Sequence, residues 1–202
     1  MTERRRVAIL ISGRGSNMRA LIEAAQAPDY PARIVGVLSS DPQAEGLALA
    51  AAAGVATASR AHGTFASREA FEAAIELELL GWRAEIVCLA GFMRILSPGF
   101  VERWRGRILN IHPSLLPAFR GLDTHRRAVA EGADEHGCTV HFVTPGLDEG
   151  PAILEARVKV LPGDTADSLA ARVLIAEHRI YPLALAMVAR GAARLDPSAE
   201  SI

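Results

Sequence analysis

Two polar side chains stand close together at the end of a predicted buried strand, in the run Leu109-Asn110-Ile111-His112-Pro113. Asn110 and His112 share one face because residues two apart in a strand do so, and Pro113 ends the pairing directly after the histidine. An amide can stabilise an oxyanion, and an imidazole can move a proton near neutral pH. The pattern predicts an acyl-transfer site. A strand-end pair that only satisfies backbone groups is the alternative.

A loop bounded by glycine and proline, Pro145-Gly146-Leu147-Asp148-Glu149-Gly150-Pro151, carries a candidate partner for the histidine. An acidic residue in such a loop is usually solvated. If Asp148 reached His112, however, its negative charge would favour the imidazolium form and equip the ring as a general acid.

A glycine-rich turn, Ser12-Gly13-Arg14-Gly15-Ser16-Asn17, joins a predicted strand to a predicted helix. Backbone N–H groups at a helix N-terminus bind anions, and glycines let a phosphate approach closely. The turn lacks the Gly-Lys-Ser/Thr of a P-loop, and Met18 replaces the third glycine of a dinucleotide fingerprint. It therefore predicts the phosphate of a small nucleotide, or else a tight turn without a ligand.

Glu177 shares a predicted helix face with Val173 and Ile180. A carboxylate at the border of a buried stripe either pairs with an arginine, such as Arg172 or Arg179, or holds a substrate ammonium group. Both interpretations stay open at this point.

The composition is that of one globular domain spanning residues 1–202, with 50% hydrophobic and 22% charged residues. A net charge of −1 gives no reason to expect nucleic acid or a membrane as partner. Cys88 and Cys138 lie in apolar runs without close spacing, which indicates buried thiols in a reducing compartment. With no signal peptide or membrane span in the sequence, we expect a cytoplasmic protein. No metal-ligand spacing is present, so no metal is expected.

The first half of the chain alternates strands and helices, which predicts an α/β fold with a Rossmann-like, mostly parallel central sheet flanked by helices. Its strands are expected near 7–11, 33–38 and 85–90, and its helices near 17–27, 46–53 and 67–80. Two strands near 140–144 and 152–160 are expected to pair antiparallel in the C-terminal half, because the gap between them holds no helix. Asp164 is expected to cap a long helix that Pro182 kinks or divides near Ile180.

Six segments together resemble one family, the phosphoribosylglycinamide formyltransferases of purine biosynthesis. The Asn-x-His-Pro-Ser-Leu-Leu-Pro run marks the wider set of formyl-tetrahydrofolate enzymes. The Ser-Gly-x-Gly-Ser-Asn start and the Glu-His-x-x-Tyr-Pro end are narrower. The segments are 10–17, 89–96, 110–117, 141–144, 147–151 and 177–182.

This resemblance implies transfer of the formyl group of 10-formyltetrahydrofolate, the co-substrate, to the amine of 5-phosphoribosylglycinamide. It implies a single formyltransferase domain acting on these two small molecules, as a monomer or a homodimer. The implied catalytic residues are Asn110, His112 and Asp148. Gly15, Ser16 and Asn17 would hold the ribonucleotide phosphate, and Glu177 the glycinamide side. The folate site would be lined by Arg68, Met93, Arg94, Ile95, Leu96, Asn110, Thr144, Pro145, Gly146, Leu147 and Asp148.

Three other functions are weighed against this one. Formyltetrahydrofolate hydrolase shares the catalytic trio but carries an extra N-terminal domain, whereas the first strand here begins at Val7. Methionyl-tRNA formyltransferase carries an added C-terminal domain and needs a basic surface for tRNA. A non-catalytic nucleotide-binding module would use the loop 13–17 alone and leave Asn110 and His112 without a role.

Overall fold

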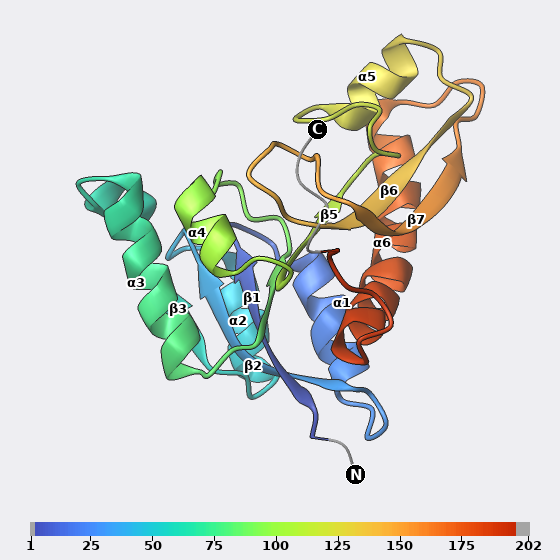
Figure 1. The fold of residues 1–202 in the computed structure, drawn as a ribbon. Coiled ribbons are helices and arrows are strands. Elements are labelled where there is room, and N and C mark those ends of the chain that lie inside the picture. The colour runs from blue at the N-terminus through green and yellow to red at the C-terminus, as the bar shows by residue number, and fades with distance from the viewer. Residues whose placement is uncertain (1–2, 197–202) are drawn as a thin grey trace.

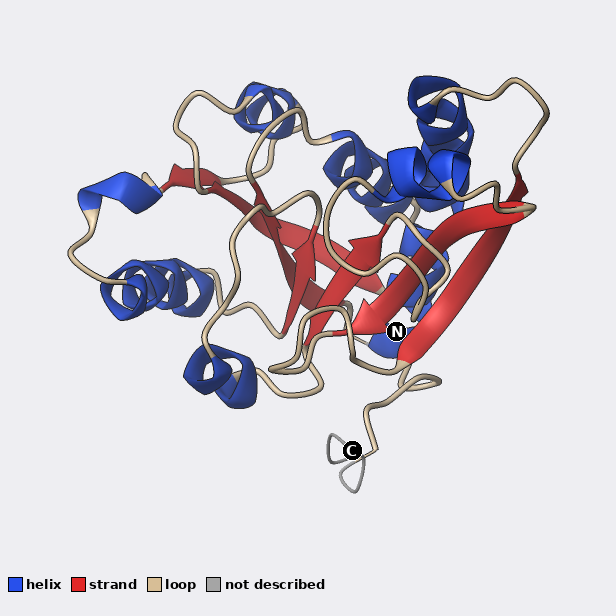
Figure 2. Cartoon of the chain, turned by 90° about the horizontal axis from the view of Figure 1, so that it is seen from above, coloured by secondary structure: helices blue, strands red, loops and turns tan. Residues whose placement is uncertain are grey.

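The structure is a computed structural model that describes residues 3–196, and its centre is a seven-stranded sheet with helices on both faces (Figures 1 and 2). The strand order is β3-β2-β1-β4-β5-β6-β7. The strands are β1 (Arg5–Ile11), β2 (Ala32–Ser39), β3 (Thr57–Ser59), β4 (Ile86–Leu89), β5 (Ile108–His112), β6 (Glu135–Phe142) and β7 (Ala152–Lys159). The helices are α1 (Ser16–Ala25), α2 (Glu45–Ala52), α3 (Arg68–Gly81), α4 (Pro98–Arg103), α5 (Thr124–Ala130) and α6 (Ala166–Ala189), with a 3₁₀ turn η1 (His62–Thr64).

The predicted α/β fold is confirmed. Strands β1 to β5 pair in parallel, β6 is antiparallel to β5, and β7 is antiparallel to β6. The expected strand pair of the C-terminal half is therefore present. The short elements β3, α4 and α5 were not predicted.

The chain reverses its direction across the sheet between β1 and β4. It runs from β1 outward through β2 to β3, and then returns to place β4 on the other side of β1. The loop after β1 consequently leads to α1 on one face of the sheet, whereas the loop after β4 leads to α4 on the other face. In open α/β sheets, such a switch point at the carboxyl ends of the strands is where ligands bind.

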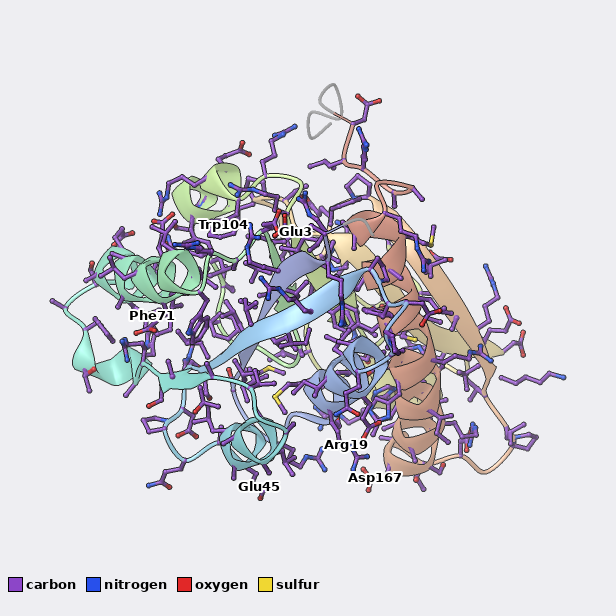
Figure 3. All side chains as sticks on the ribbon, turned by 90° about the horizontal axis from the view of Figure 1, so that it is seen from below. Glu3, Arg19, Glu45, Phe71, Trp104 and Asp167 are labelled. Atoms are coloured by element: carbon purple, nitrogen blue, oxygen red, sulfur yellow. The ribbon has the colours of Figure 1, made fainter. Side chains whose placement is uncertain are left out.

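Each face of the sheet has its own apolar core. One core is formed with α3 and α4, and contains Phe71 and Trp104; the other is formed with α1, α2 and α6. In Figure 3, Phe71 and Trp104 lie on one side of the sheet, while labelled residues of α1, α2 and α6 lie on the other. In β5, Ile108 belongs to the α3–α4 core and Leu109 to the α6 core. Because alternate residues share a face, the side chains at positions 110 and 112 follow Ile108 toward the α3–α4 side.

Both cysteines are free and fully buried, as expected. Burial raises the pKa of each thiol to about 12. Within the described residues, no helix is long and apolar enough to cross a membrane.

The long helix α6 begins one residue later than predicted. Thr165, and not Asp164, is its N-cap: the Thr165 hydroxyl accepts a hydrogen bond from the Ser168 N–H at 3.1 Å, and the Ser168 hydroxyl accepts one from the Thr165 N–H at 3.0 Å. The Asp164 carboxylate accepts instead from the Leu161 N–H and forms an ion pair with Arg172. This pair also removes Arg172 as a partner for Glu177.

Pro182 does not divide α6, so the predicted division near Ile180 is wrong, while the alternative, a kink there, stays a prediction. The helix is continuous from Ala166 to Ala189 with the proline inside it. Residues on both sides of the proline, Tyr181 and Leu185 among them, are fully buried against the sheet. Tertiary packing therefore offsets the hydrogen bond that the proline removes.

Thr165→Ala tests the reciprocal cap. We expect the free energy of unfolding, measured by urea denaturation, to fall by about 1 kcal/mol because the Ser168 N–H loses its side-chain acceptor. Thr165→Ser retains the hydroxyl and serves as the matched control, with stability close to that of the parent. Equal stability of the alanine and serine variants would contradict the capping role.

Candidate active site

The imidazole of His112 lies next to the carboxylate of Asp148 at the carboxyl end of β5. The distance from His112 Nδ1 to Asp148 Oδ2 is 3.4 Å, and both side chains are less than 10% exposed. The acidic loop between β6 and β7 thus turns back over β5 (Figure 1). The conditional expectation that Asp148 reaches His112 is met by this geometry.

Asp148 is held in this position by an unusual backbone conformation. Its φ is 51°, in the left-handed region that few residues other than glycine adopt. Its Oδ2 also accepts a hydrogen bond from the Gly121 N–H at 3.0 Å. The loop closes tightly at Gly150, where a Cβ atom would lie 1.7 Å from the Phe142 carbonyl oxygen. Such strain persists only where the surrounding structure enforces it, and it gathers at functional sites.

The second ring nitrogen of His112 is also occupied. Nε2 lies 3.0 Å from the carbonyl oxygen of Phe119, a residue that likewise has a positive φ, of 53°. A carbonyl and a carboxylate can only accept protons, so a protonated ring would have both of its N–H groups satisfied. The orientation of the ring is fixed from both sides.

A second histidine, His141, orients the amide of Asn110. The two residues are directly paired in the β5–β6 register, and Asn110 Nδ2 lies 3.2 Å from His141 Nε2. His141 Nδ1 lies 2.9 Å from the Phe142 carbonyl oxygen, so Nδ1 carries the proton and Nε2 accepts from the amide. Burial lowers the pKa of His141, which keeps the ring neutral and able to accept. The other proton of the amide stays available to a ligand.

His141 was not among the predicted site residues, although it lies in one of the resembling segments. It also lies 3.9 Å, through Nε2, from Asp148 Oδ1. The structure therefore brings together the three predicted residues, Asn110, His112 and Asp148, with His141 as a fourth member.

The glycine-rich turn borders a hollow of about 230 Å³ at the switch point of the sheet. Gly15 stands directly before α1 with a φ of 74°, and a Cβ atom there would lie 3.0 Å from the Gly46 Cα. The turn is tied to the loop after β4, because the Ser12 hydroxyl accepts from the Met93 N–H at 2.8 Å. The hollow is lined by Ser12, Gly13, Arg14, Gly15, Ser16, Asn17, Ala90, Gly91 and Met93.

Asn17 and Glu177 meet beside this turn, which the sequence alone did not indicate. Asn17 Nδ2 donates to Glu177 Oε2 at 2.6 Å, and both side chains are buried. Burial raises the pKa of Glu177, whereas the hydrogen bond from Asn17 opposes that shift. The buried Asn17 Oδ1 has no hydrogen-bond partner among the described residues. The pair therefore presents acceptor oxygens suited to a cationic N–H donor.

The residues expected at the folate site are less closely gathered. Met93 and Ile95 are exposed in the loop after β4, whereas Leu96 is packed into the α3–α4 core. Arg68 begins α3, is exposed and lies 4.0 Å from the carboxylate of Glu69. Within residues 3–196, no hydrogen bond or ion pair joins Arg68 to another predicted site residue.

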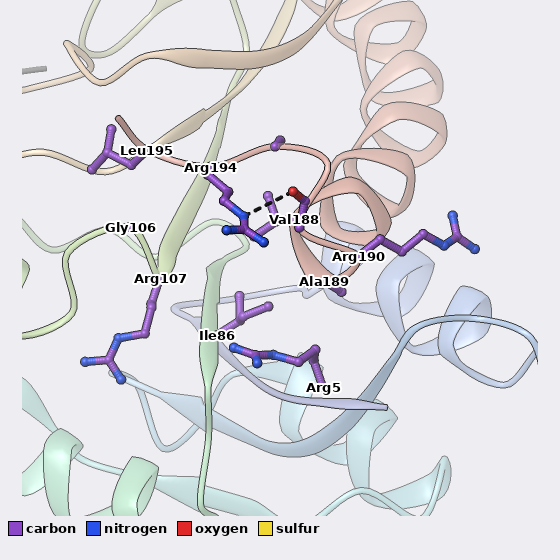
Figure 4. A pocket seen from close by; sticks show the side chains of 11 residues that line it. Arg5, Ile86, Gly106, Arg107, Val188, Ala189, Arg190, Arg194 and Leu195 are labelled. Atoms are coloured by element: carbon purple, nitrogen blue, oxygen red, sulfur yellow. Dashed lines mark hydrogen bonds between the residues drawn. The ribbon is translucent and has the colours of Figure 1, made fainter. Parts of the chain in front are cut away.

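A larger hollow, of about 430 Å³, lies at the opposite edge of the sheet. Figure 4 shows Arg5 and Arg194 toward its centre, with Arg107 and Arg190 directed outward on either side. None of the predicted site residues lines it. The candidate active site is therefore the carboxyl edge, where the β1, β4 and β5 loops meet the β6–β7 loop.

Comparison with known proteins agrees with this geometry. Residues 5–185 match the formyl transferase family. The chain belongs to this family. A solved structure of phosphoribosylglycinamide formyltransferase from Brucella melitensis is 58% identical, with a TM-score of 0.89, over 93% of this chain and 96% of that one.

Two curated formyl transferase relatives differ greatly in length. Phosphoribosylglycinamide formyltransferase of Escherichia coli is 46% identical over 96% of this chain and 91% of that protein. Trifunctional purine biosynthetic protein adenosine-3 of Drosophila melanogaster is 48% identical over 98% of this chain. The chain spans 15% of the length of this trifunctional relative.

A stack of rings packs against the segment that contacts His112. His136 lies edge-on to Phe119, at 5.6 Å between ring centroids, and edge-on to His125, at 5.1 Å. His136 is 1% exposed. Burial, with a smaller contribution from His125, lowers its pKa from 6.5 to about 4.

The low pKa of His136 predicts a loss of stability in mild acid. As the pH falls below 6.5, the unfolded chain takes up a proton that the folded protein binds only near pH 4. We expect this residue to remove about 1 kcal/mol or more of unfolding free energy between about pH 7 and pH 5. His136→Gln should reduce the pH dependence measured by urea denaturation. An unchanged pH dependence in this variant would show that His136 is not a source of it.

Proposed function

We propose that this chain transfers the formyl group of 10-formyltetrahydrofolate to the amine of 5-phosphoribosylglycinamide. The observation that carries the proposal is the convergence of Asn110, His112 and Asp148 at the end of β5. The formyl transferase family in general uses formyl-tetrahydrofolate as co-substrate. The names of the relatives, phosphoribosylglycinamide formyltransferase, supply the acceptor.

The ribonucleotide fits the side of the site next to α1. Its phosphate would accept hydrogen bonds from the backbone N–H groups of residues 15–17 at the helix N-terminus. Arg14, which lines the hollow, would add a positive charge. The amine would lie against the acceptor oxygens of Asn17 and Glu177. Folate would then lie along the loop after β4, at Met93 to Leu96, and along the loop from Thr144 to Asp148, with Arg68 farther out.

The reaction exchanges one bond to the formyl carbon for another. The amine nitrogen attacks that carbon, and the carbonyl oxygen becomes negatively charged in the tetrahedral intermediate. The bond from the carbon to the folate nitrogen then breaks. One proton passes in total from the attacking amine to the departing nitrogen, so no oxidant or reductant is required.

The geometry of the trio suits each of these steps. The amide of Asn110, fixed by His141, would donate its free proton to the developing oxyanion. A protonated His112 would stabilise the same charge and then supply a proton to the leaving nitrogen. Asp148 would hold the ring in its orientation and balance its charge. Asn110 and Asp148 are in place before substrate binds, which keeps the reorganisation small. His112 Nε2 would exchange its contact to the Phe119 carbonyl oxygen for one to the substrate.

We further infer that residues 1–202 act as one formyltransferase domain in the cytoplasm, where two buried thiols stay reduced. The partners would be the two small-molecule substrates, without nucleic acid or membrane. We expect the enzyme to be a monomer or a homodimer.

An assay of tetrahydrofolate formation tests the proposed function. We expect product from 10-formyltetrahydrofolate only when 5-phosphoribosylglycinamide is present. Product at the same rate without the acceptor would identify a hydrolase instead. Binding of the ribonucleotide without any folate turnover would identify a nucleotide-binding module.

His112→Ala in the same assay tests the proton carrier. We expect kcat to fall by about 10²- to 10⁴-fold, because positioned acid–base catalysis contributes that much. The affinity for the ribonucleotide should stay within a few-fold, since its predicted contacts lie at α1 and α6. His62→Ala, in the turn η1, is the control and should keep the parent rate. A His112→Ala enzyme as fast as this control would remove the histidine from the mechanism.

Glu177→Gln tests the amine site. The amide can still pair with Asn17 but carries no charge, so we expect ribonucleotide affinity, measured by titration calorimetry, to fall by about 10-fold. The matched control is Glu72→Gln. Glu72 is an equally buried carboxylate that accepts hydrogen bonds from Ser97 between α3 and α4. If both variants bound the ribonucleotide like the parent, Glu177 would have only a structural role.

A further inference from the structure

The hydroxyl of Tyr181 joins the ends of the two strands that flank the site. It lies 3.0 Å from the Leu89 carbonyl oxygen, at the end of β4, and 3.1 Å from the Leu109 carbonyl oxygen in β5. Because a phenol has one proton, it shares that proton between the two carbonyls. Tyr181 is fully buried, and burial raises its pKa well above the usual value. The group therefore stays a neutral donor.

Both carbonyls belong to peptide units that lead directly into the site. The Leu109 carbonyl is in the same peptide plane as the backbone nitrogen of Asn110, so fixing it fixes the start of that residue. The Leu89 carbonyl leads into Ala90, which lines the hollow at the glycine-rich turn. Leu89 is also the register partner of Asn110 in the β4–β5 pairing. The tyrosine thus acts where β4 ends and β5 continues.

The other end of this contact is the turn of α6 that carries Glu177. Tyr181 follows Glu177 by four residues, so both lie on one face of the helix. Pro182 has no N–H, which leaves the His178 carbonyl without its helical donor and weakens α6 at this point. Contacts from outside the helix hold it here: Tyr30 donates to the Pro182 carbonyl oxygen at 2.7 Å, and Tyr181 binds the sheet.

We propose that Tyr181 is a positioning residue that sets the placement of Asn110 relative to Glu177, and through it the rate of formyl transfer. This inference rests on the proposed function. Tyr181 itself touches neither substrate, because its side chain has no exposed surface. Its effect reaches the reaction through the Asn110 amide, whose contact to the oxyanion exists only in the transition state. The hydroxyl should therefore change kcat far more than KM.

Tyr181→Phe and Tyr30→Phe form a matched pair, since these are the two tyrosines of the chain and both hydroxyls donate to backbone carbonyls. Tyr181 donates from α6 to the ends of β4 and β5, whereas Tyr30 donates to a carbonyl within α6. Each variant is measured in the acceptor-dependent tetrahydrofolate assay and by urea denaturation. We expect both to lose stability. We expect kcat to fall by about 10-fold in Tyr181→Phe, with KM for the ribonucleotide within about 3-fold, because small displacements of a catalytic group are costly. Tyr30→Phe should keep kcat within about 2-fold.

The outcomes separate the two proposals. If the parent and Tyr30→Phe transfer formyl and Tyr181→Phe has the same kcat, the positioning role is overturned and the proposed function stands. If the parent forms no product with the acceptor, the proposed function fails. Should Tyr181→Phe not fold, 3-fluorotyrosine incorporated into Tyr30→Phe labels Tyr181 alone. A ¹⁹F resonance that moves on adding 5-phosphoribosylglycinamide supports the coupling, and an unmoved resonance overturns it.

Discussion

The contact between the Asp148 carboxylate and the His112 imidazole is the interaction on which the site depends. It joins the loop between β6 and β7, which carries Asp148, to the end of β5, which carries His112. Two non-glycine residues with positive φ, Asp148 and Phe119, place their oxygens on the two ring nitrogens. Each such conformation costs on the order of 1–3 kcal/mol. That cost is offset by contacts that fix the loops, among them the Gly121 N–H on the carboxylate. Part of the stability of the fold therefore offsets the backbone strain that fixes the orientation of the His112 ring.

Burial gives this polar cluster its strength and also its rigidity. His112, His141 and Asp148 are each nearly excluded from water, which strengthens every electrostatic contact between them. The same exclusion would make an unpaired group expensive, and the contacts are accordingly reciprocal: His141 accepts from the Asn110 amide and donates to the Phe142 carbonyl. His141 and His112 therefore have different roles. One ring orients a donor, while the other is available to move a proton.

Features set by neighbouring residues could be predicted from the sequence, whereas those set by register and packing could not. Strand alternation was sufficient to place Asn110 and His112 on one face. His141 depends on the antiparallel register of β5 and β6, for which no local pattern exists. Helices α4 and α5 have too few turns to show a helical period. At α6, an aspartate and a threonine stand side by side, and both are good N-caps, so only the hydrogen bonds decide between them.

The sheet itself imposes the remaining constraint, because the two halves of the proposed site lie on opposite faces of it. His112 follows Ile108 toward the α3–α4 side, whereas Glu177 is carried by α6 on the other side. A substrate can reach both only over the carboxyl edge, where β4 has ended and β5 still continues. The distance between amine and formyl carbon is therefore set by how α6 is seated against these two strand ends. The proline weakens α6, so the hydrogen bonds within the helix cannot by themselves fix its position against the sheet. Side chains that bind the sheet must fix that position, as the Tyr181 hydroxyl does at the ends of β4 and β5.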